Sequence, residues 1–337
     1  MQTCTPPLRK KNDMQLITEI DRWPLKRPFK IAYHTFTQRD LLRVELHEDG
    51  LTGRGEAGGH PQLEPIETAQ QRVLSMRDDI AAGITREDLL TRMPLGPARN
   101  ALDCAMWDLE AKRAGRRVWD LADLPRPRPI LTAYTIGVAA TIEIVEEAKR
   151  MREYPLLKLK VDGESGFELL QAVAAARPDA SYIIDANEAW RPDQLERFIA
   201  EAGDLSVELI EQPLPKGDDA ALANLQSPIP LAADESFHGV SDIERMTGHY
   251  DVINIKLDKI GGLTEALLAA RAARERGLRV MVGCNGGTSL GIAPAYCLGL
   301  LCDFVDLDSP LLLAHDREPG LEYHNGHVSP PDVSVWG

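Results

Sequence analysis

Cysteine and long apolar runs are both scarce in this sequence, and each shortage excludes a class of protein. The five cysteines form no CxxC pair and no zinc-like spacing with histidine. They indicate a reduced, cytoplasmic compartment and argue against a disulfide scaffold. No stretch approaches the roughly 18 apolar residues of a membrane-spanning helix. The polar, basic segment 1–13 precedes no apolar signal region, so we expect a disordered extension there.

Positive charge is also in short supply. Lysine and arginine number 38 against 52 aspartate and glutamate residues, which gives a formal net charge of −14 at pH 7. The chain therefore lacks the basic face that nucleic acid or an anionic membrane would require, and we expect neither as a partner. A length of 337 residues with 44% hydrophobic residues suits a globular protein of two domains, or one barrel with additions. A small molecule is the expected substrate.

The first part of the chain has the pattern of strands followed by helices. Residues 14–59 alternate between apolar and polar side chains, which predicts antiparallel strands. Residues 65–120 have helical spacing, most clearly over 98–114, where apolar residues recur on one face. The proline-rich segment 124–129 cannot continue a helix and predicts a domain boundary.

After this segment, short apolar runs alternate with helical stretches. The eight runs lie at 131–137, 156–161, 182–187, 207–213, 230–236, 251–257, 279–284 and 304–309. Helices are predicted between them, for example at 141–154, 166–177, 194–202 and 263–276. Strands that alternate with helices form a parallel sheet covered by helices. Eight of them suit a closed barrel better than an open sheet.

Most of these runs end in a charge or an amide, although a buried parallel strand should be apolar. Successive runs end in Lys160, Asp185, Glu211, Asp234 and Lys256, separated by 25, 26, 23 and 22 residues. Because each step is one strand-and-helix unit, the five charges occupy equivalent strand ends. These ends converge on one mouth, where barrel enzymes place their active sites. One such charge is usually the start of a solvated loop, but five in register favour a shared site.

The three acids predict a metal site. Asp185, Glu211 and Asp234 would repel one another at a common mouth without a cation. An all-oxygen set without histidine or cysteine favours Mg²⁺ over zinc. Such an ion keeps coordination positions for substrate oxygens, so we expect it to bind a carboxylate of the substrate.

Two lysines flank the acids in strand order, Lys160 before them and Lys256 after. A lysine close to a metal and to another lysine has its ammonium form disfavoured, and can act as a base near neutral pH. Lys158 shares the strand face of Lys160, so we expect it to lower the pKa of Lys160 and to neutralise oxyanion charge. This arrangement is typical of abstracting a proton next to a carboxylate. Two bases on opposite faces permit inversion of the stereocentre.

The ordered motifs resemble those of the enolase superfamily, muconate-lactonizing enzyme subgroup, from about residue 14 onward. They are Leu157-Lys-Leu-Lys160, Asp185-Ala-Asn187, Glu211-Gln-Pro213, Asp234-Glu-Ser236 and Asn254-Ile-Lys-Leu-Asp-Lys-Ile-Gly-Gly262. The resemblance implies a (β/α)₇β TIM-type barrel over 129–309. It also implies an α+β capping domain built from 14–128 and the C-terminal tail 310–337. Members often assemble as dimers or octamers, so a homo-oligomer is expected by analogy alone.

The same resemblance implies residue roles. One Mg²⁺ per subunit would be held by Asp185, Glu211 and Asp234, with Lys160 and Lys256 as the acid/base pair. Within the subgroup the chain looks most like the dipeptide epimerases, of the L-Ala-D/L-Glu epimerase type, through Asp306-Leu307-Asp308 on the last strand. In that family such a motif binds the free ammonium of a dipeptide, which suits two carboxylates. Further substrate contacts are implied for Thr135, Lys158 and Cys284, although Cys284 could equally be a small apolar filler.

The expected reaction is a Mg²⁺-dependent inversion of the α-carbon of the C-terminal residue, by 1,1-proton transfer through a metal-stabilised enolate. Three relatives stay open as alternatives: an o-succinylbenzoate synthase, a muconate cycloisomerase and an N-acylamino acid racemase. The two lyases have no ammonium to bind. A Schiff-base aldolase would not need three acids, and a non-catalytic barrel would not need both lysines.

The side chain of the substrate is left open. We expect loops at 31–39 and 56–64 to select it. Candidate contacts are Arg39, Lys30 and His34 for an acidic side chain, Tyr33 and Phe36 for an apolar one, and Glu64 for a cationic one.

Overall fold

The computed structural model describes residues 14–31, 34–59, 63–163 and 166–337. The extension predicted at 1–13 lies outside this range, as do Tyr33 and parts of the two loops predicted to select the side chain. In the described ranges, no helix combines the length and the apolar character needed to cross a membrane.

The chain begins with a three-stranded antiparallel sheet, as its alternating pattern predicts. The strands are β1 (Gln15–Lys30), β2 (Thr35–Glu48) and β3 (Leu51–Gly58), in the order β1-β2-β3. Asp49 and Gly50 join β2 to β3 with φ angles of 50° and 78°, the left-handed backbone that a two-residue hairpin turn requires. Leu42, Val44 and Leu46 of β2 form an apolar core with the helices that follow.

The helices that follow are α1 (Ile66–Ser75), α2 (Arg77–Ala81), α3 (Arg86–Arg92), α4 (Pro97–Ala114) and α5 (Val118–Leu121). The helix predicted at 98–114 is confirmed as α4, which begins with a proline and ends at Gly115 with a φ of 59°. It lies directly on β3. A Cβ added to Gly55 would stand 2.1 Å from the carbonyl oxygen of Ala101, so only glycine allows this approach.

The second half of the chain forms the predicted parallel barrel. Its strands are β5 (Tyr134–Ile136), β6 (Leu156–Lys160), β7 (Ser181–Asp185), β8 (Val207–Glu211), β9 (Leu231–Ala233), β10 (Val252–Lys256), β11 (Arg279–Gly283) and β12 (Phe304–Val305). They pair in parallel in the order of the sequence. The amide of Ala133, just before β5, donates to the carbonyl of Val305 in β12 at 2.9 Å, so the first and last strands meet.

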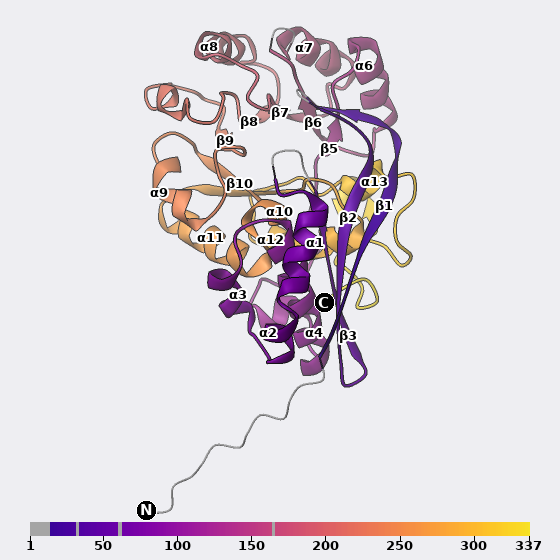
Figure 1. Cartoon of the computed structure of the whole chain (residues 1–337). Coiled ribbons are helices and arrows are strands. Elements are labelled where there is room, and N and C mark those ends of the chain that lie inside the picture. The colour runs from indigo at the N-terminus through magenta and orange to yellow at the C-terminus, as the bar shows by residue number, and fades with distance from the viewer. Residues whose placement is uncertain (1–13, 32–33, 60–62, 164–165) are drawn as a thin grey trace, which may run out of the picture.

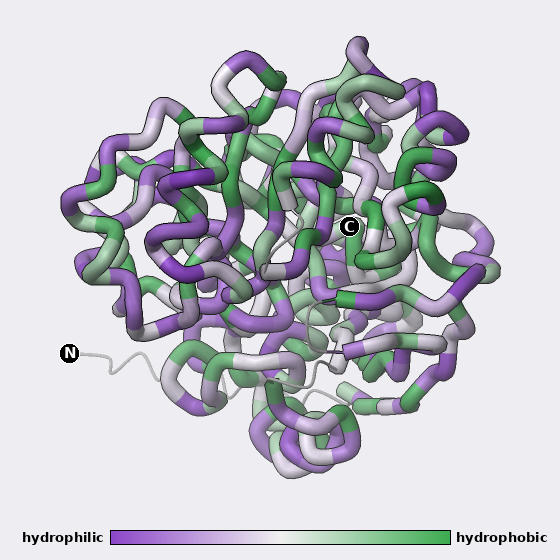
Figure 2. Tube along the Cα trace, turned by 90° about the horizontal axis from the view of Figure 1, so that it is seen from above, coloured by the Kyte–Doolittle hydropathy of each residue, from purple (hydrophilic) through white to green (hydrophobic). Residues whose placement is uncertain are grey.

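Helices cover the outside of the barrel. The four predicted helices are confirmed as α6 (Thr141–Arg150), α7 (Gly166–Ala176), α8 (Pro192–Glu201) and α11 (Leu263–Glu275), and α12 (Ser289–Gly299) adds a fifth. The connections also contain short helical turns: η1 (Asp219–Leu222), η2 (Val240–Asp242), α9 (Ile243–Met246) and α10 (Leu257–Ile260), the last directly before α11. Hydrophilic and hydrophobic positions alternate along the peripheral helices (Figure 2), as expected for helices with one buried face.

The long β1–β2 hairpin runs along one side of the barrel, and α1 to α4 gather beside it (Figure 1). The tail after β12 contacts both the barrel and the N-terminal sheet. It contains α13 (Ser309–Leu312), and its strands β13 (Tyr323–His324) and β14 (His327–Val328) pair with β4 (Ile130–Leu131) next to the barrel. Trp336 donates its indole N–H to the carbonyl of Arg54 in β3 at 2.9 Å. The domain boundaries placed at 128 and 309 stay predictions.

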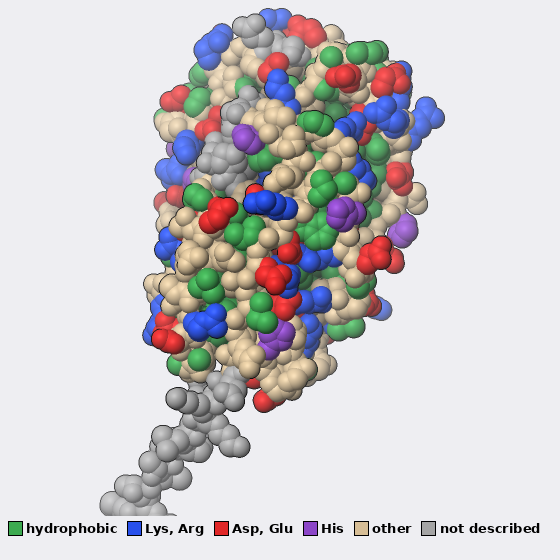
Figure 3. Space-filling model, turned by 45° about the vertical axis from the view of Figure 1, so that its right-hand side comes forward, with side chains coloured by type: hydrophobic (Ala, Val, Ile, Leu, Met, Phe, Trp, Pro, Cys, Tyr) green, Lys and Arg blue, Asp and Glu red, His purple; other side chains and the backbone are tan. Residues whose placement is uncertain are grey.

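The side chains on the surface agree with the charge balance of the sequence. On the face shown in Figure 3, acidic and basic side chains are interspersed among apolar and neutral ones. Such a face does not have the single-sign field that draws in nucleic acid.

Glu56 of β3 joins three segments that are distant in sequence. It is 1% exposed. Its Oε1 accepts the amide of Thr288 at 2.8 Å, and its Oε2 accepts the hydroxyl of Thr288 and the guanidinium of Arg317, each at 2.7 Å. Glu56 therefore holds β3 to the loop before α12 and to the C-terminal tail.

We predict that Glu56→Ala lowers the free energy of unfolding by about 3 kcal/mol, because it leaves the buried donors of Thr288 without an acceptor and leaves Asp21 as the remaining acid beside Arg317. Urea titration followed by circular dichroism measures the change. The matched control is Glu201→Ala, which breaks the surface pair of Glu201 with Arg197 and should cost less than about 0.5 kcal/mol. Equal effects of the two substitutions would contradict this account.

Candidate active site

The ionisable residues of the predicted site share one face of the barrel strands. A small apolar layer fills the barrel interior, formed by Ala133, Leu156, Ile183, Leu209, Ala232, Val252 and Met281. Side chains alternate along a strand, so residues two and four positions later face the same interior. Those positions hold Thr135, Lys158, Lys160, Asp185, Glu211, Asp234, Asn254 and Lys256. A polar layer thus follows the apolar one at the carboxyl ends of the strands.

Lys158 lies at the centre of this polar layer and is 1% exposed. Its Nζ lies 3.0 Å from Asp185 Oδ2, 2.7 Å from Glu211 Oε2 and 2.8 Å from Asp306 Oδ2. Burial lowers the pKa of Lys158, but the three acids together raise it well above its ordinary value. Lys158 is therefore a fixed cation that connects β6 with β7, β8 and the end of β12.

Asp234, directly after β9, accepts hydrogen bonds from two lysines that lie three residues apart in the sequence. Lys256 Nζ donates to Oδ2 at 2.7 Å, and Lys259 Nζ donates to Oδ1 and to the backbone carbonyl, both at 2.5 Å. Burial raises the pKa of Asp234, but Lys256 and Lys259 lower it to well below its ordinary range. Lys259 is not among the site residues predicted from the sequence. Its spacing of three from Lys256, at the start of a helix, could have suggested it.

The site lysines lie beside acids rather than beside one another. Burial lowers the pKa of Lys256, but Asp234 and Glu211 raise it above its ordinary value. Lys160, expected to be influenced by Lys158, instead donates to Asp185 Oδ2 at 2.5 Å. The lysines of the site are thus paired with the very acids that were predicted to hold a cation.

The predicted ammonium site lies where β12 meets β5. The hydroxyl of Thr135 donates to Asp306 Oδ1 at 3.1 Å, and the Thr135 amide donates to Asp308 Oδ2 at 2.5 Å. Burial, followed by repulsion from Asp306, raises the pKa of Asp308 to about 7. Leu307 differs from its neighbours, because its side chain lies in the apolar core and its amide donates to Thr132 at 2.9 Å.

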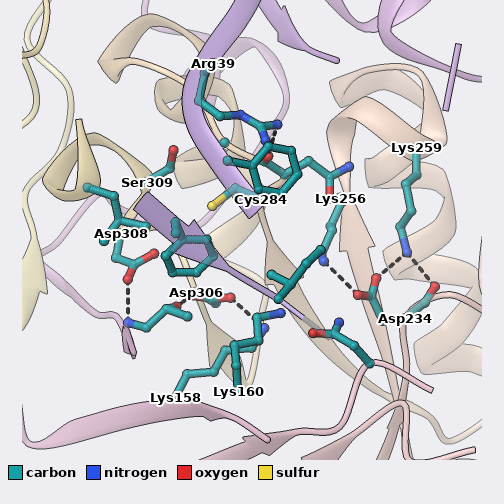
Figure 4. A pocket seen from close by; sticks show the side chains of 18 of the residues that line it. Arg39, Lys158, Lys160, Asp234, Lys256, Lys259, Cys284, Asp306, Asp308 and Ser309 are labelled. Carbon is teal, nitrogen blue, oxygen red and sulfur yellow. Dashed lines mark hydrogen bonds and ion pairs between the residues drawn. The ribbon is translucent and has the colours of Figure 1, made fainter. Parts of the chain in front are cut away.

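A pocket opens over the polar layer and places these groups together (Figure 4). Thr135, Lys158, Lys160, Asp234, Lys256, Cys284, Asp306 and Asp308 line it, whereas Asp185 and Glu211 lie fully buried beneath. Burial raises the pKa of Cys284, so its sulfur stays a thiol near neutral pH. Ile31, Phe36, Arg39 and Leu63 line the pocket from the first part of the chain, across from the strand ends.

The predicted metal ligands do not converge as they stand. Among the described residues, no group of three acidic, cysteine or histidine side chains is arranged to hold an ion, because Lys158 lies between Asp185 and Glu211. The donor set nevertheless fits a hard cation. The buried oxygens Asn187 Oδ1 and Glu235 Oε2 accept no hydrogen bond, and Glu211 Oε2 lies beside the ammonium of Lys158, at 2.7 Å. Unsatisfied carboxylate and amide oxygens are the ligands that Mg²⁺ prefers.

The pKa values of these acids support the same reading. Burial, followed by repulsion from Asp185, raises the pKa of Glu211 to about 7. Burial and repulsion from Asp234 raise the pKa of Glu235 to about 8. Burial also raises the pKa of Asp185, but Lys160, Lys158 and Lys256 lower it to about 2. The mouth thus holds acidic groups with too little positive charge around them.

Two family models match the chain. Residues 13–122 match "Mandelate racemase / muconate lactonizing enzyme, N-terminal domain", and residues 143–334 match "Enolase C-terminal domain-like". The chain is 40% identical to the L-Ala-D/L-Glu epimerase of Escherichia coli K12 over 311 residues, which cover 91% of this chain and 97% of the relative.

Two solved structures extend the comparison. One is an enolase family member from Agrobacterium tumefaciens with homology to dipeptide epimerases and with bound sodium and L-Ala-L-Glu. It is 43% identical, covers 96% of this chain and 100% of its own, and has a TM-score of 0.93. The other is a dipeptide epimerase from Methylococcus capsulatus in complex with Mg and L-Arg-D-Lys, 30% identical over 95% of this chain and 97% of its own, with a TM-score of 0.88.

We predict that Mg²⁺ affinity falls as the pH drops below about 7, by roughly tenfold per pH unit, because Glu211 with its raised pKa then takes up a competing proton. Asp185, with a pKa of about 2, stays ionised throughout. Isothermal titration of the protein with MgCl₂ at pH 6 and pH 8, without substrate, measures the effect. Glu211→Gln should flatten the dependence, and an affinity that is equal at both pH values would refute the assignment.

Proposed function

This chain belongs to the mandelate racemase / muconate lactonizing enzyme family of the enolase superfamily, and we propose that it is a dipeptide epimerase. It would invert the α-carbon of the C-terminal residue of a dipeptide, as an isomerase acting on amino acid derivatives. The observation that carries this proposal is the arrangement of charges around the barrel mouth. Lys160 and Lys256 stand on two sides, the three acids Asp185, Glu211 and Asp234 on a third, and Asp306 with Asp308 on the fourth. A cytoplasmic location, suggested by the four cysteines of the described residues, which form no disulfide, stays part of the proposal.

The strand order supports a pair of opposed bases. Lys160 ends β6 and Lys256 ends β10, four strands apart in the eight-stranded sheet. In a closed barrel these strands stand on opposite sides, so the two ammonium groups face each other across the mouth. One lysine, in its neutral form, would take the α-proton on its Nζ, and the other would return a proton to the opposite face of the carbon.

Acidic groups occupy the two sides of the mouth that lie between the lysines. Asp185, Glu211 and Asp234 come from β7, β8 and β9, and Asp306 and Asp308 follow β12, which stands four strands from β8. A dipeptide would therefore lie with its carboxylate toward the three acids and its ammonium toward Asp306 and Asp308. This orientation places the α-carbon of the C-terminal residue between the two lysines.

Asp185, Glu211 and Asp234 would hold one Mg²⁺ per subunit. When bound, the ion supplies positive charge that stabilises developing negative charge on the substrate carboxylate and disfavours the ammonium forms of nearby lysines. The relatives support this proposal, since the Methylococcus enzyme carries Mg with its dipeptide. Lys158, a fixed cation beside Asp185 and Glu211, would add charge on the same side of the substrate. The two acids after β12 disfavour the lyases, which have no ammonium to bind.

We predict that removal of either lysine base prevents inversion of the C-terminal α-carbon but still allows exchange of its proton. In D₂O with Mg²⁺ and an L,L-dipeptide, the native protein should add deuterium at the C-terminal α-carbon and form the L,D epimer. Lys160→Ala and Lys256→Ala should each lower epimerisation by at least about 10³-fold, while each still exchanges the α-proton of one epimer, a different one in each variant. Mass spectrometry with chiral chromatography reads both events.

The control is Lys149→Ala, which removes an exposed lysine of α6 and should leave both events unchanged. Exchange and inversion that survive in both site variants would exclude the two-base assignment. Absence of exchange with any dipeptide in the native protein would exclude the dipeptide epimerase itself.

We also predict that Asp308→Asn removes the preference for a free ammonium. The native protein should process a dipeptide about 10–100-fold faster than its N-acetyl form, measured as kcat/KM, because the charged hydrogen bond is lost on acetylation. In the variant the two rates should converge. A native protein that prefers the N-acetyl form would instead support an N-acylamino acid racemase.

A further inference from the structure

The segment 256–264, which joins β10 to α11, carries two of the lysines at the barrel mouth. It begins with Lys256 at the end of β10, continues through α10 and two glycines, and ends in the first turn of α11. Lys256 and Lys259 both reach Asp234 from this segment (Figure 4), at 2.7 and 2.5 Å. The position of the segment therefore determines where both ammonium groups lie.

Helix α4, from the first part of the chain, holds this segment through buried side chains. Arg99, 2% exposed, donates through Nη2 to the carbonyl of Ile260 at 2.7 Å and through Nε to the carbonyl of Gly261 at 3.1 Å. Asn100, also buried, donates through Nδ2 to Asp258 Oδ1 at 2.8 Å. Asp258 lies only two residues after Lys256, so the hold of α4 reaches almost to the base itself.

Asp103 of α4 caps α11 from outside that helix. The N-cap position of α11 is Gly262, which has no side chain to accept the first free amides of the helix. Asp103 Oδ2 accepts the amide of Thr264 at 3.0 Å, and its Oδ1 accepts the hydroxyl of Thr264 at 2.5 Å. A carboxylate at this end also suits the helix dipole. Helix α4 thus supplies the cap that the segment itself lacks.

The two glycines before α11 make room for these α4 side chains. A Cβ added to Gly261 would stand 2.3 Å from Arg99 Nε, and one added to Gly262 would stand 2.5 Å from Asp103 Oδ2. Both glycines also have left-handed φ angles, of 82° and 113°. The Gly261-Gly262 pair of the sequence motif therefore serves the approach of α4.

We propose that Asp103, together with Arg99 and Asn100, positions Lys256 as a base, and that it does not position the opposite base Lys160. This inference rests on the proposed epimerase function. Lys160 ends β6 and forms its ion pair with Asp185 of the neighbouring strand β7, within the barrel. Because a shift of about 1 Å in a reacting group can lower a rate about 100-fold, loosening the hold of α4 would weaken one base and spare the other.

Asp103→Asn disturbs this contact without changing the size of the side chain. The hydroxyl oxygen of Thr264 accepts the indole N–H of Trp107 at 3.0 Å and the guanidinium of Arg86 at 3.2 Å. These two bonds use both of its lone pairs, so its hydrogen points to Asp103. An asparagine at 103 would set its NH₂ group against either the hydroxyl or the amide of Thr264, and both are donors. The start of α11 then has to move.

The test measures each base alone, in the two single-lysine variants. In Lys160→Ala the α-proton that exchanges in D₂O is the one taken by Lys256, and in Lys256→Ala it is the one taken by Lys160. The probe is L-Ala-Glu or, where it exchanges faster, L-Ala-Leu, saturating, with Mg²⁺, supplied as both epimers and followed by mass spectrometry. Burial raises the pKa of Asp103 and of Asp258 to about 6, so an assay at pH 8 keeps both ionised.

Asp103→Asn added to Lys160→Ala should lower the exchange rate about 10–100-fold, because the segment that carries Lys256 has shifted. Added to Lys256→Ala, it should change the rate by less than about threefold, as expected for independent sites. Asn100→Ala, which removes the donor to Asp258, should give the same one-sided loss and serves as the second variant if Asp103→Asn does not fold. Thermal unfolding of each variant reports on folding.

Asp108→Asn is the matched control, since it makes the same change at a buried acid of the same helix. Asp108 accepts the amides of Arg54 and Gly337, at 2.7 and 2.8 Å, outside the segment 256–264. It should leave both residual exchange rates within about threefold.

Equal loss in the two lysine backgrounds would give α4 a general structural role and overturn the inference. No loss in either background, or a loss confined to Lys256→Ala, would also overturn it while leaving the epimerase intact. No exchange by the native protein with either dipeptide would overturn the proposed function and this inference with it.

Discussion

Compensation of buried charge at the barrel mouth is the constraint on which the site depends. The strands end in acids and lysines that lie on the inward face, directly after an apolar layer. Each buried charge requires a counter-charge, and the chain supplies it by placing Lys160 and Lys256 on either side of the three acids and Lys158 among them. Lys158 between Asp185, Glu211 and Asp306 is the centre of that arrangement. The balance is incomplete, as the raised pKa values of Glu211 and Asp308 indicate, and this deficit is what a cation and an ammonium would fill.

The first part of the chain and the tail complete what the barrel leaves open. Glu56 and Arg317 tie β3 to the segments on either side of the last strand. Arg39 ties the start of β2 to Asn285, next to Cys284 at the end of β11. These contacts hold the wall with Phe36 and Arg39 in a fixed position over the lysines. Placing the proposed chemistry on strand ends and the predicted selectivity on this wall allows each to vary independently.

The sequence predicts the barrel and the candidate site well, because both depend on local repetition. The period of 22 to 26 residues between charges follows from one strand and one helix per unit, and the alternation along a strand places Lys158 with Lys160. What the sequence cannot give is pairing across the mouth. Lysines were expected to repel one another, yet Lys158, Lys160 and Lys256 each lie beside an acid, a pairing that the spacing along the chain does not reveal. Lys259 was missed as a partner of Asp234, and Leu307 was predicted at a site from which its side chain points away. Of Arg39, Lys30 and His34, which the sequence does not separate, Arg39 is buried and the other two are exposed.

The central claim is that Asp185, Glu211 and Asp234 form a cation site whose place Lys158 partly fills. Anomalous X-ray diffraction from crystals grown with Mn²⁺, a probe with the ligand preferences of Mg²⁺, tests it directly. The account predicts one strong anomalous peak bounded by these three carboxylates, with Lys158 and Lys160 withdrawn from Asp185. A peak elsewhere, for instance between Asp306 and Asp308, or no peak at a saturating Mn²⁺ concentration, would contradict it.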